Sequence, residues 1–121
     1  MTLVSTEWLN NNLSKVKIFD ASWHMPNSNR NAHKEFLNKH IPGAMFWDID
    51  EHSDKDSPFP HMLPNSDYWT RMLWSFGIEN DDHIVVYDFS DLHSSCRLWF
   101  SLKYFGHKKV SVLDGCMKKW L

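Results

Sequence analysis

The run from His83 to Arg97, HIVVYDFSDLHSSCR, combines residue types that perform chemistry in many α/β enzymes. A short apolar strand leads into a polar loop, and the loop leads into a helix. Many α/β enzymes carry a nucleophile directly after such a strand, and here this position holds Asp88. The sequence therefore poses the question whether this chain performs chemistry itself or frames chemistry performed elsewhere.

The same run ends in a cysteine beside an arginine, Cys96 and Arg97. A phosphatase loop of the Cys-x5-Arg type needs its arginine six positions after the cysteine, so this pair does not cradle an anion. We expect Cys96, and also Cys116, to pack as small apolar side chains. Because the histidines and cysteines show neither HxxxH nor CxxC spacing, we expect no metal site and no cofactor.

Length and composition limit the class of protein. With 121 residues the chain makes one domain, 1–121, which is large enough to bury a core. The 13 basic and 15 acidic residues nearly balance, which argues against a nucleic acid partner or a membrane surface. The sequence shows no apolar run of about 20 residues, and its start lacks the pattern of a signal peptide. Together with only two cysteines, these features predict a cytoplasmic protein.

Hydrophobic spacing, caps and turn residues predict alternating strands and helices. The predicted strands are 3–5, 16–20, 44–49, 84–87 and 110–113. The predicted helices begin at 5 or 6, at 33, at 66 or 67, at 94 or 95 and at 116, and the first four end near 13, 39, 76 and 106. We expect the last helix to be cut short at Leu121. The fourteen residues 51–64 form a long Pro-rich loop of a kind that is usually either disordered or functional.

This alternation predicts a parallel sheet with helices on both faces, in which the working site lies at the carboxyl ends of the strands. Aspartates follow four of the predicted strands: Asp20, the pair Asp48 and Asp50, Asp88 and Asp114. Strand-end carboxylates also suit a Mg²⁺ site for phosphoryl chemistry, as in receiver-like folds. That reading needs a lysine beyond a late strand, and none directly follows 110–113, so we rank it lowest.

Several motifs together resemble one family. VSTEWL, IFDASW, HIPGAMFWDID, SPFPHMLP, GIENDDHIVVYD, RLWFSLKYFGH and VLDG occur in the order and with the gaps seen in the N-terminal half of tandem rhodaneses, the two-domain thiosulfate or 3-mercaptopyruvate sulfurtransferases. The resemblance covers essentially the whole chain. It implies a rhodanese-like five-stranded parallel sheet with helices on both faces, in agreement with the pattern of strands and helices.

The resemblance also assigns a role to Asp88. In the family only the second domain carries the nucleophilic cysteine, directly after its fourth strand, and Asp88 occupies the equivalent position here. A loop of converging N–H groups at a helix N-terminus favours an anion such as a persulfide, and an aspartate supplies that anion permanently. We therefore expect Asp88 to accept hydrogen bonds from N–H groups within 89–93 and to be structural rather than reactive.

Three further residues match functional positions of the family. Asp50 in WDID, and His61 eleven residues later in HMLP, match a supporting pair that reaches the cysteine loop of the second domain. The carboxylate would orient the imidazole, which relays a proton near neutral pH. Arg97 matches the arginine that opens the following helix and would attract a small anionic sulfur donor.

The leading hypothesis is therefore the first, non-nucleophilic domain of a sulfurtransferase, whose second rhodanese domain is absent from these residues. The 121-residue chain alone is then predicted to be inactive. The alternative is a free-standing inactive rhodanese module that binds a partner protein through its aromatic face. The chain has 18 aromatic residues, seven of them Trp, and we expect the core to hold most of them and an interface to cover the surplus.

Overall fold

The computed structural model describes residues 2–57, 62–90 and 93–121. Its strands form one parallel sheet in the order β1-β5-β4-β2-β3. The strands are β1 (Leu3–Val4), β2 (Lys17–Asp20), β3 (Ala44–Phe46), β4 (Ile84–Tyr87) and β5 (Val110–Leu113). The helices are α1 (Thr6–Asn11), the 3₁₀ turn η1 (Leu13–Lys15), α2 (Ala32–Asn38), α3 (Ser66–Ser75), α4 (Ser95–Tyr104) and α5 (Cys116–Trp120). The predicted five-stranded parallel α/β fold is confirmed.

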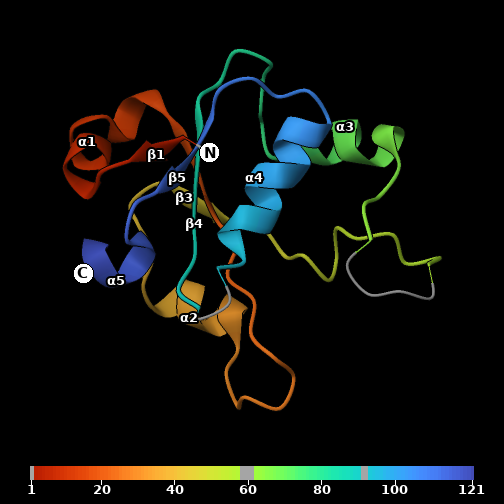
Figure 1. The fold of residues 1–121 in the computed structure, drawn as a ribbon, viewed down its shortest axis with the longest axis horizontal. Coiled ribbons are helices and arrows are strands. Elements are labelled where there is room, and N and C mark those ends of the chain that lie inside the picture. The colour runs from red at the N-terminus through yellow and green to blue at the C-terminus, as the bar shows by residue number, and fades with distance from the viewer. Residues whose placement is uncertain (1, 58–61, 91–92) are drawn as a thin grey trace.

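The central strand β4 explains the two-sided core. All four of its residues are buried, and alternate side chains enter different clusters, as strand geometry requires. Ile84 and Val86 pack with residues of α3 and α4, whereas Val85 and Tyr87 pack with residues of α1 and α5. Helices therefore cover both faces of the sheet, as predicted (Figure 1).

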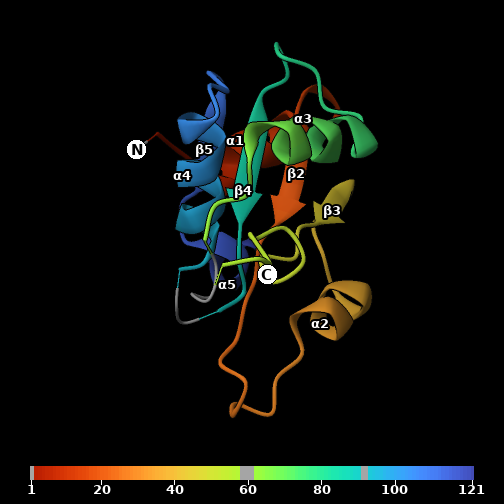
Figure 2. The ribbon, with the colours of Figure 1, turned by 90° about the vertical axis from the view of Figure 1, so that its right-hand side faces the viewer.

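The strands β2 and β4 bring Asp20 and Asp88 together at the carboxyl ends of the sheet. Asp20, the last residue of β2, pairs in register with Tyr87, and the Ala21 N–H donates to the Tyr87 carbonyl at 2.9 Å. In Figure 2 the arrows of β2 and β4 point to the end of the molecule where α2 and the preceding loop lie. Asp88 therefore begins its loop beside the end of β2.

The third strand is shorter than predicted, because it ends at Phe46 rather than at Ile49. The Trp47 N–H still donates to the Asp20 carbonyl at 2.9 Å. One residue later, the Asp48 carboxylate accepts the Asp50 N–H at 2.9 Å, and the Asp48 carbonyl accepts the His52 N–H at 3.0 Å. These bonds curl the chain into a turn, so Asp50 lies four residues beyond the end of the strand.

Two helix ends also differ from the prediction. The cap of α3 is Asn65, whose side chain accepts the Tyr68 N–H at 2.8 Å, and not Ser66 or Asp67. The first helix ends at Asn11 because the amide of Asn12 donates to the Trp8 carbonyl at 2.7 Å and closes its last turn. In the described part of the chain, no helix is long and apolar enough to cross a membrane.

Candidate active site at the carboxyl ends of the strands

The Asp88 carboxylate is buried and fully engaged. One oxygen accepts the Ser90 N–H at 3.1 Å and the Ser90 hydroxyl at 3.2 Å. The other accepts the Ser95 N–H at 2.9 Å and the Ser95 hydroxyl at 2.5 Å. The bond from the Ser90 N–H confirms the expected contact with the loop, and the bond from Ser95 adds a donor from the first turn of α4. With only 2% of its surface exposed, Asp88 closes this cradle of N–H groups.

Both cysteines lie near Asp88 and share a cavity of about 370 Å³ with it. The Cys116 Sγ lies 3.9 Å from an Asp88 oxygen and 3.8 Å from the Ser95 hydroxyl. Burial, followed by the negative charge of Asp88, raises the pKa of both thiols, Cys96 and Cys116. They are thereby kept protonated and poorly nucleophilic at neutral pH.

Cys116 has an unusual backbone for its residue type. Its φ of 50° lies in the left-handed region, which glycine adopts without strain. The side chain packs against the clusters on both faces of the sheet, as the sequence predicted for a small apolar residue. A packing role therefore accounts for Cys116.

A hydrogen-bonded relay ties the loop after β4 to the end of β2, and the sequence analysis did not identify it. The Ser22 N–H and hydroxyl both donate to one Asp20 oxygen, at 2.9 and 2.5 Å. The Ser22 hydroxyl in turn accepts the Phe89 N–H at 2.7 Å. Burial raises the pKa of Asp20, against the lowering effect of the Ser22 bonds and with a further rise from the charge of Asp88. The buried carboxyl of Asp20 thus fixes Ser22, and Ser22 fixes the residue next to Asp88.

Arg30 holds the same residue from the other side. Its guanidinium donates to the Phe89 carbonyl at 3.1 Å and lies 5.7 Å from the centre of the Phe89 ring. It also forms two bonds to the Glu35 carboxylate, at 3.0 and 2.9 Å, and His24 contacts the same carboxylate at 2.9 Å. Burial would raise the pKa of Glu35, but the bonds from Arg30 and His24 outweigh it and lower that pKa. Nothing in the sequence indicates this contact between Arg30 and residue 89, because the two lie 59 positions apart.

Asp50 lies at the surface, four residues after β3 ends. Its carboxylate accepts the Trp23 indole N–H at 3.1 Å, which connects it to the loop after β2. Asp50, Trp23 and Arg30 line a cavity of about 250 Å³ together with Asp48 and Ser22. The structure therefore brings Asp50 to the carboxyl ends of β2 and β3, the edge at which α/β sheets bind ligands.

The structure does not place the other two predicted site residues in this arrangement. His61 lies outside the described residues, so its pairing with Asp50 stays a prediction. Arg97 lies half-buried in the first turn of α4, where burial lowers the pKa of its guanidinium. Arg97 is not among the described residues that line the cavities of Asp88 and Asp50. Within the described chain, no three His, Cys, Asp or Glu side chains gather in a way that could hold a metal ion.

Comparisons with known proteins agree on one family. The Rhodanese-like domain family matches residues 5–121. The 3-mercaptopyruvate sulfurtransferase of Mus musculus is 43% identical over 98% of this chain, and the match covers 43% of that protein. The thiosulfate/3-mercaptopyruvate sulfurtransferase 1, mitochondrial, of Arabidopsis thaliana is 43% identical over 98% of this chain and is covered to 32%.

Solved structures give the same result. The crystal structure of SseA from Escherichia coli, a 3-mercaptopyruvate sulfotransferase with the rhodanese fold, superimposes on this chain with a TM-score of 0.91 at 40% identity. The match covers 99% of this chain and 47% of SseA. The chain therefore spans less than half the length of these relatives.

Proposed function

The chain belongs to the rhodanese-like domain family, and from this premise we propose that it is the N-terminal, non-nucleophilic domain of a thiosulfate or 3-mercaptopyruvate sulfurtransferase. Its match to the N-terminal part of relatives that carry these names supports the proposal. The substrate is then a small anionic sulfur donor, and the partner is a second rhodanese domain. The two free thiols of the described chain suit a reducing compartment, so we propose a cytoplasmic location.

In this proposal the chemistry starts at a cysteine thiolate of the second domain. The thiolate attacks the transferable sulfur of the donor and forms a persulfide, while sulfite leaves from thiosulfate or the enolate of pyruvate leaves from 3-mercaptopyruvate. Cyanide or a thiol then attacks the outer sulfur, and the thiolate is released again. The enolate needs a proton, which a histidine with a pKa near neutrality is suited to deliver.

The first domain contributes the supporting pair and its positioning. The Trp23 indole fixes the Asp50 carboxylate, and this carboxylate orients the His61 imidazole in the required tautomer. The relay through Ser22 and the clamp of Arg30 hold the loops that line the edge of the sheet. Arg30 lines this cavity but is already paired with Glu35, so the cation that attracts the anionic sulfur donor in this proposal is Arg97.

One observation supports the proposal: the Asp88 carboxylate fills a cradle of N–H and hydroxyl donors after β4, the place that the proposal equates with the persulfide of a sulfur carrier. Four donors from Ser90 and Ser95 already satisfy it, so a second anion finds no place there. The nearby thiols have raised pKa values and do not replace a nucleophile. The chain therefore needs a second domain for sulfur transfer.

A second candidate, the partner-binding module without enzymatic activity, is supported by exposed aromatic side chains. Trp74 on α3 exposes 73% of its surface, and Phe100 and Tyr104 on α4 expose 51% and 64%. Aromatic residues are enriched where proteins bind one another. This candidate predicts binding without catalysis under any pairing of domains.

Formation of thiocyanate from cyanide tests the proposal. The purified 121-residue chain is assayed with thiosulfate and with 3-mercaptopyruvate, next to its Cys96→Ser variant and to the complete mouse relative as a positive control. We expect thiocyanate from the mouse enzyme only. Activity of this chain that survives Cys96→Ser would contradict the assignment as a non-nucleophilic domain.

A further inference from the structure

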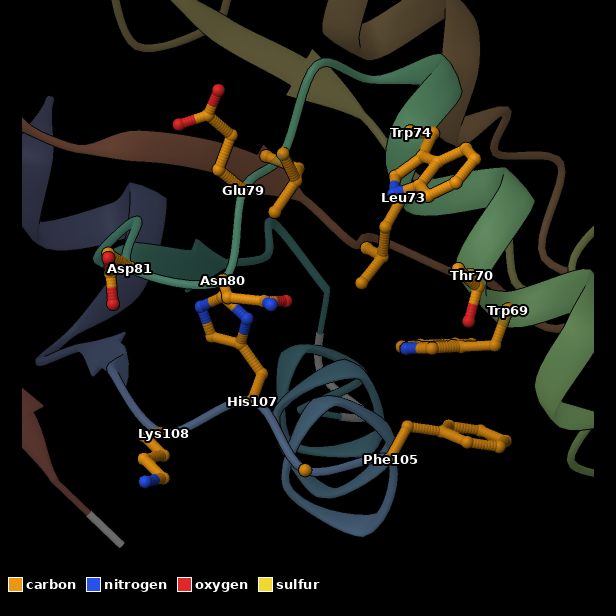
Figure 3. Close-up of a pocket in the computed structure, with 12 residues that line it drawn as sticks. Trp69, Thr70, Leu73, Trp74, Glu79, Asn80, Asp81, Phe105, His107 and Lys108 are labelled. Carbon is orange, nitrogen blue, oxygen red and sulfur yellow. The ribbon is translucent and has the colours of Figure 1, made fainter.

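A separate cavity of about 380 Å³ lies at the amino ends of the strands, opposite the carboxyl ends at which Asp88 lies. It opens between the end of α3, the loop that precedes β4 and the turn that precedes β5, and Figure 3 shows the residues that line it. Its volume falls in the range of small-molecule sites, about 300 to 1,000 Å³. Because loops that precede parallel strands lie at their amino ends, this cavity is distinct from the proposed sulfur-transfer site.

Polar and apolar surface contribute about equally to the walls of the cavity, and the apolar part comes from aromatic and aliphatic side chains. The Trp69 indole stacks on the Phe105 ring, with 4.7 Å between centroids and 18° between planes. Leu73 and Ile78 add aliphatic surface, and the His107 ring lies opposite Leu73 (Figure 3). A flat, apolar molecule matches such walls better than a strongly hydrated one.

The charges around the cavity disfavour anions. Glu79 and Asp81 contribute two carboxylates to the lining, and Lys108 contributes one ammonium group. In Figure 3 the side chains of Glu79 and Asp81 point away from the centre of the cavity, so these charges act from its rim. A negative excess at the rim repels thiosulfate and other anionic sulfur donors and favours an uncharged ligand.

One hydrogen-bond donor of the wall has no acceptor. Trp69 is 3% exposed, and its buried Nε1–H donates to no acceptor in the part of the chain that the structure describes. The nitrogen end of the indole points toward the space bordered by Leu73, Asn80 and His107 (Figure 3). A buried donor without a partner costs about 1–3 kcal/mol, which an acceptor on a ligand would recover.

The imidazole of His107 is fixed beside this donor. Its Nε2 lies 2.7 Å from the Asp82 carbonyl, and a carbonyl only accepts, so Nε2 carries a proton. This bond fixes the orientation of the ring against the loop before β4. The cavity is therefore lined by a rigid imidazole and a rigid indole, with the exposed side chain of Asn80 between them.

We propose that this cavity binds a small, uncharged, planar heteroaromatic molecule whose ring nitrogen accepts a hydrogen bond from Trp69 Nε1. The ring of the ligand packs against Leu73 and Ile78, and its acceptor satisfies the indole donor. Such a site is independent of sulfur transfer, since it uses neither Asp88 nor Asp50.

Benzimidazole and indole provide a matched pair of probes. They have nearly the same shape, and both are uncharged at pH 7.5, but only benzimidazole has an in-plane ring nitrogen that accepts. Each is titrated into the ¹⁵N-labelled 121-residue chain, and the seven indole N–H signals are followed by NMR. We expect benzimidazole to bind about tenfold more tightly than indole and to shift the Trp69 signal downfield.

Two variants test the assigned donor, and a third tests the location. Trp69→Phe keeps a ring for stacking but removes the donor, so benzimidazole should bind it no more tightly than indole does. Trp99→Phe removes another buried indole N–H without an acceptor, from a residue outside this cavity, and should leave binding unchanged. Thr70→Trp adds bulk at the exposed rim without altering the core, and should weaken binding at least tenfold.

Equal affinity for the two probes would overturn the proposal, as would the absence of benzimidazole binding. Binding that shifts only another indole signal would overturn it too. If Trp69→Phe does not fold, the Thr70→Trp variant decides, because undiminished binding there would place the ligand elsewhere.

Discussion

At the scale of single residues, the Asp88 carboxylate fills a cradle of N–H and hydroxyl donors at the end of β4. The N–H groups of Ser90 and Ser95 stabilise any anion at the end of β4. A carboxylate attached to the chain occupies this place at all times and is held by two serine hydroxyl groups as well. The same donors that would activate a thiolate therefore stabilise the fold here.

Removal of this carboxylate should strongly destabilise the chain. In Asp88→Ala the buried N–H groups of Ser90 and Ser95 lose their acceptors, so we expect the free energy of unfolding to fall by about 3 kcal/mol. Urea denaturation followed by circular dichroism measures the change. Asp114→Ala is the matched control, because this strand-end aspartate is exposed and pairs loosely with Lys119, at 4.0 Å. This variant should cost less than about 0.5 kcal/mol. Similar losses in the two variants would contradict the structural role of Asp88.

Asp20 should make stability depend on pH. Burial raises the pKa of Asp20 in the folded chain above its ordinary value of 3.8, so the folded state binds the proton more tightly than the unfolded state. This carboxyl therefore favours folding at low pH, and its contribution is lost as the pH rises through the window that opens at 3.8. Asp20→Asn keeps an oxygen acceptor for Ser22 but does not ionise.

The pH dependence gives a direct comparison of this variant with the unmodified chain. Between pH 4 and pH 7, we expect the free energy of unfolding of Asp20→Asn to rise relative to the unmodified chain, because only the unmodified chain loses this contribution. Urea denaturation at both pH values gives the difference. Asp114→Asn, at an exposed position, should show no such trend. A difference that is flat, or that falls with pH, would exclude the assigned cause.

At the scale of elements, the sequence predicted the strands and helices that hydrophobic spacing and turn residues determine. The strand 110–113 agrees with the structure residue by residue, because its apolar run is bounded by clear turn residues. The third strand was predicted too long, since the spacing of 44–49 carries no sign that the Asp48 side chain will close a turn. Local propensity thus identified the elements, whereas side-chain hydrogen bonds to the backbone decided where they end.

The candidate site divides in the same way. Asp88 and Asp50 were selected among the strand-end aspartates because they match positions of the rhodanese family, and the carboxyl ends of parallel strands converge. Ser22 and Arg30 were not found, because their contacts with residue 89 span 67 and 59 positions of the chain. Only the pairing of β2 with β4 brings these segments together.

The contact from Ser22 should therefore be worth more than a local serine bond. Ser22→Ala removes the hydroxyl that donates to the buried Asp20 carboxyl and accepts the Phe89 N–H, while the residue 22 N–H remains, so we expect a loss of about 2 kcal/mol. Hydrogen exchange of the Phe89 amide should accelerate as well. Ser28→Ala is the control, since Ser28 bonds only within its own exposed loop. An unchanged Phe89 amide in Ser22→Ala would show that the relay does not hold this loop.

At the scale of the whole molecule, the chain has a separate cavity at each edge of its sheet and lacks a reactive thiolate at both. The edge that carries Asp50 and Arg30 is the one that a second domain would complete, and the relatives are more than twice as long as this chain. In the function that we propose, this domain contributes by position, and its role is then measurable when the nucleophile of another domain is present.

A chimera makes this contribution measurable. It joins the 121-residue chain to the part of the mouse 3-mercaptopyruvate sulfurtransferase that lies beyond the matched segment, and thiocyanate formation is followed with 3-mercaptopyruvate as donor. We expect the chimera to be active, and Asp50→Asn to lower its kcat about tenfold or more, because an unoriented histidine delivers its proton poorly. Asp114→Asn, also at a strand end but without a contact to Trp23, should retain full activity. Equal rates for the two variants would show that Asp50 does not support the reaction, and that these residues supply only the surface on which the second domain rests.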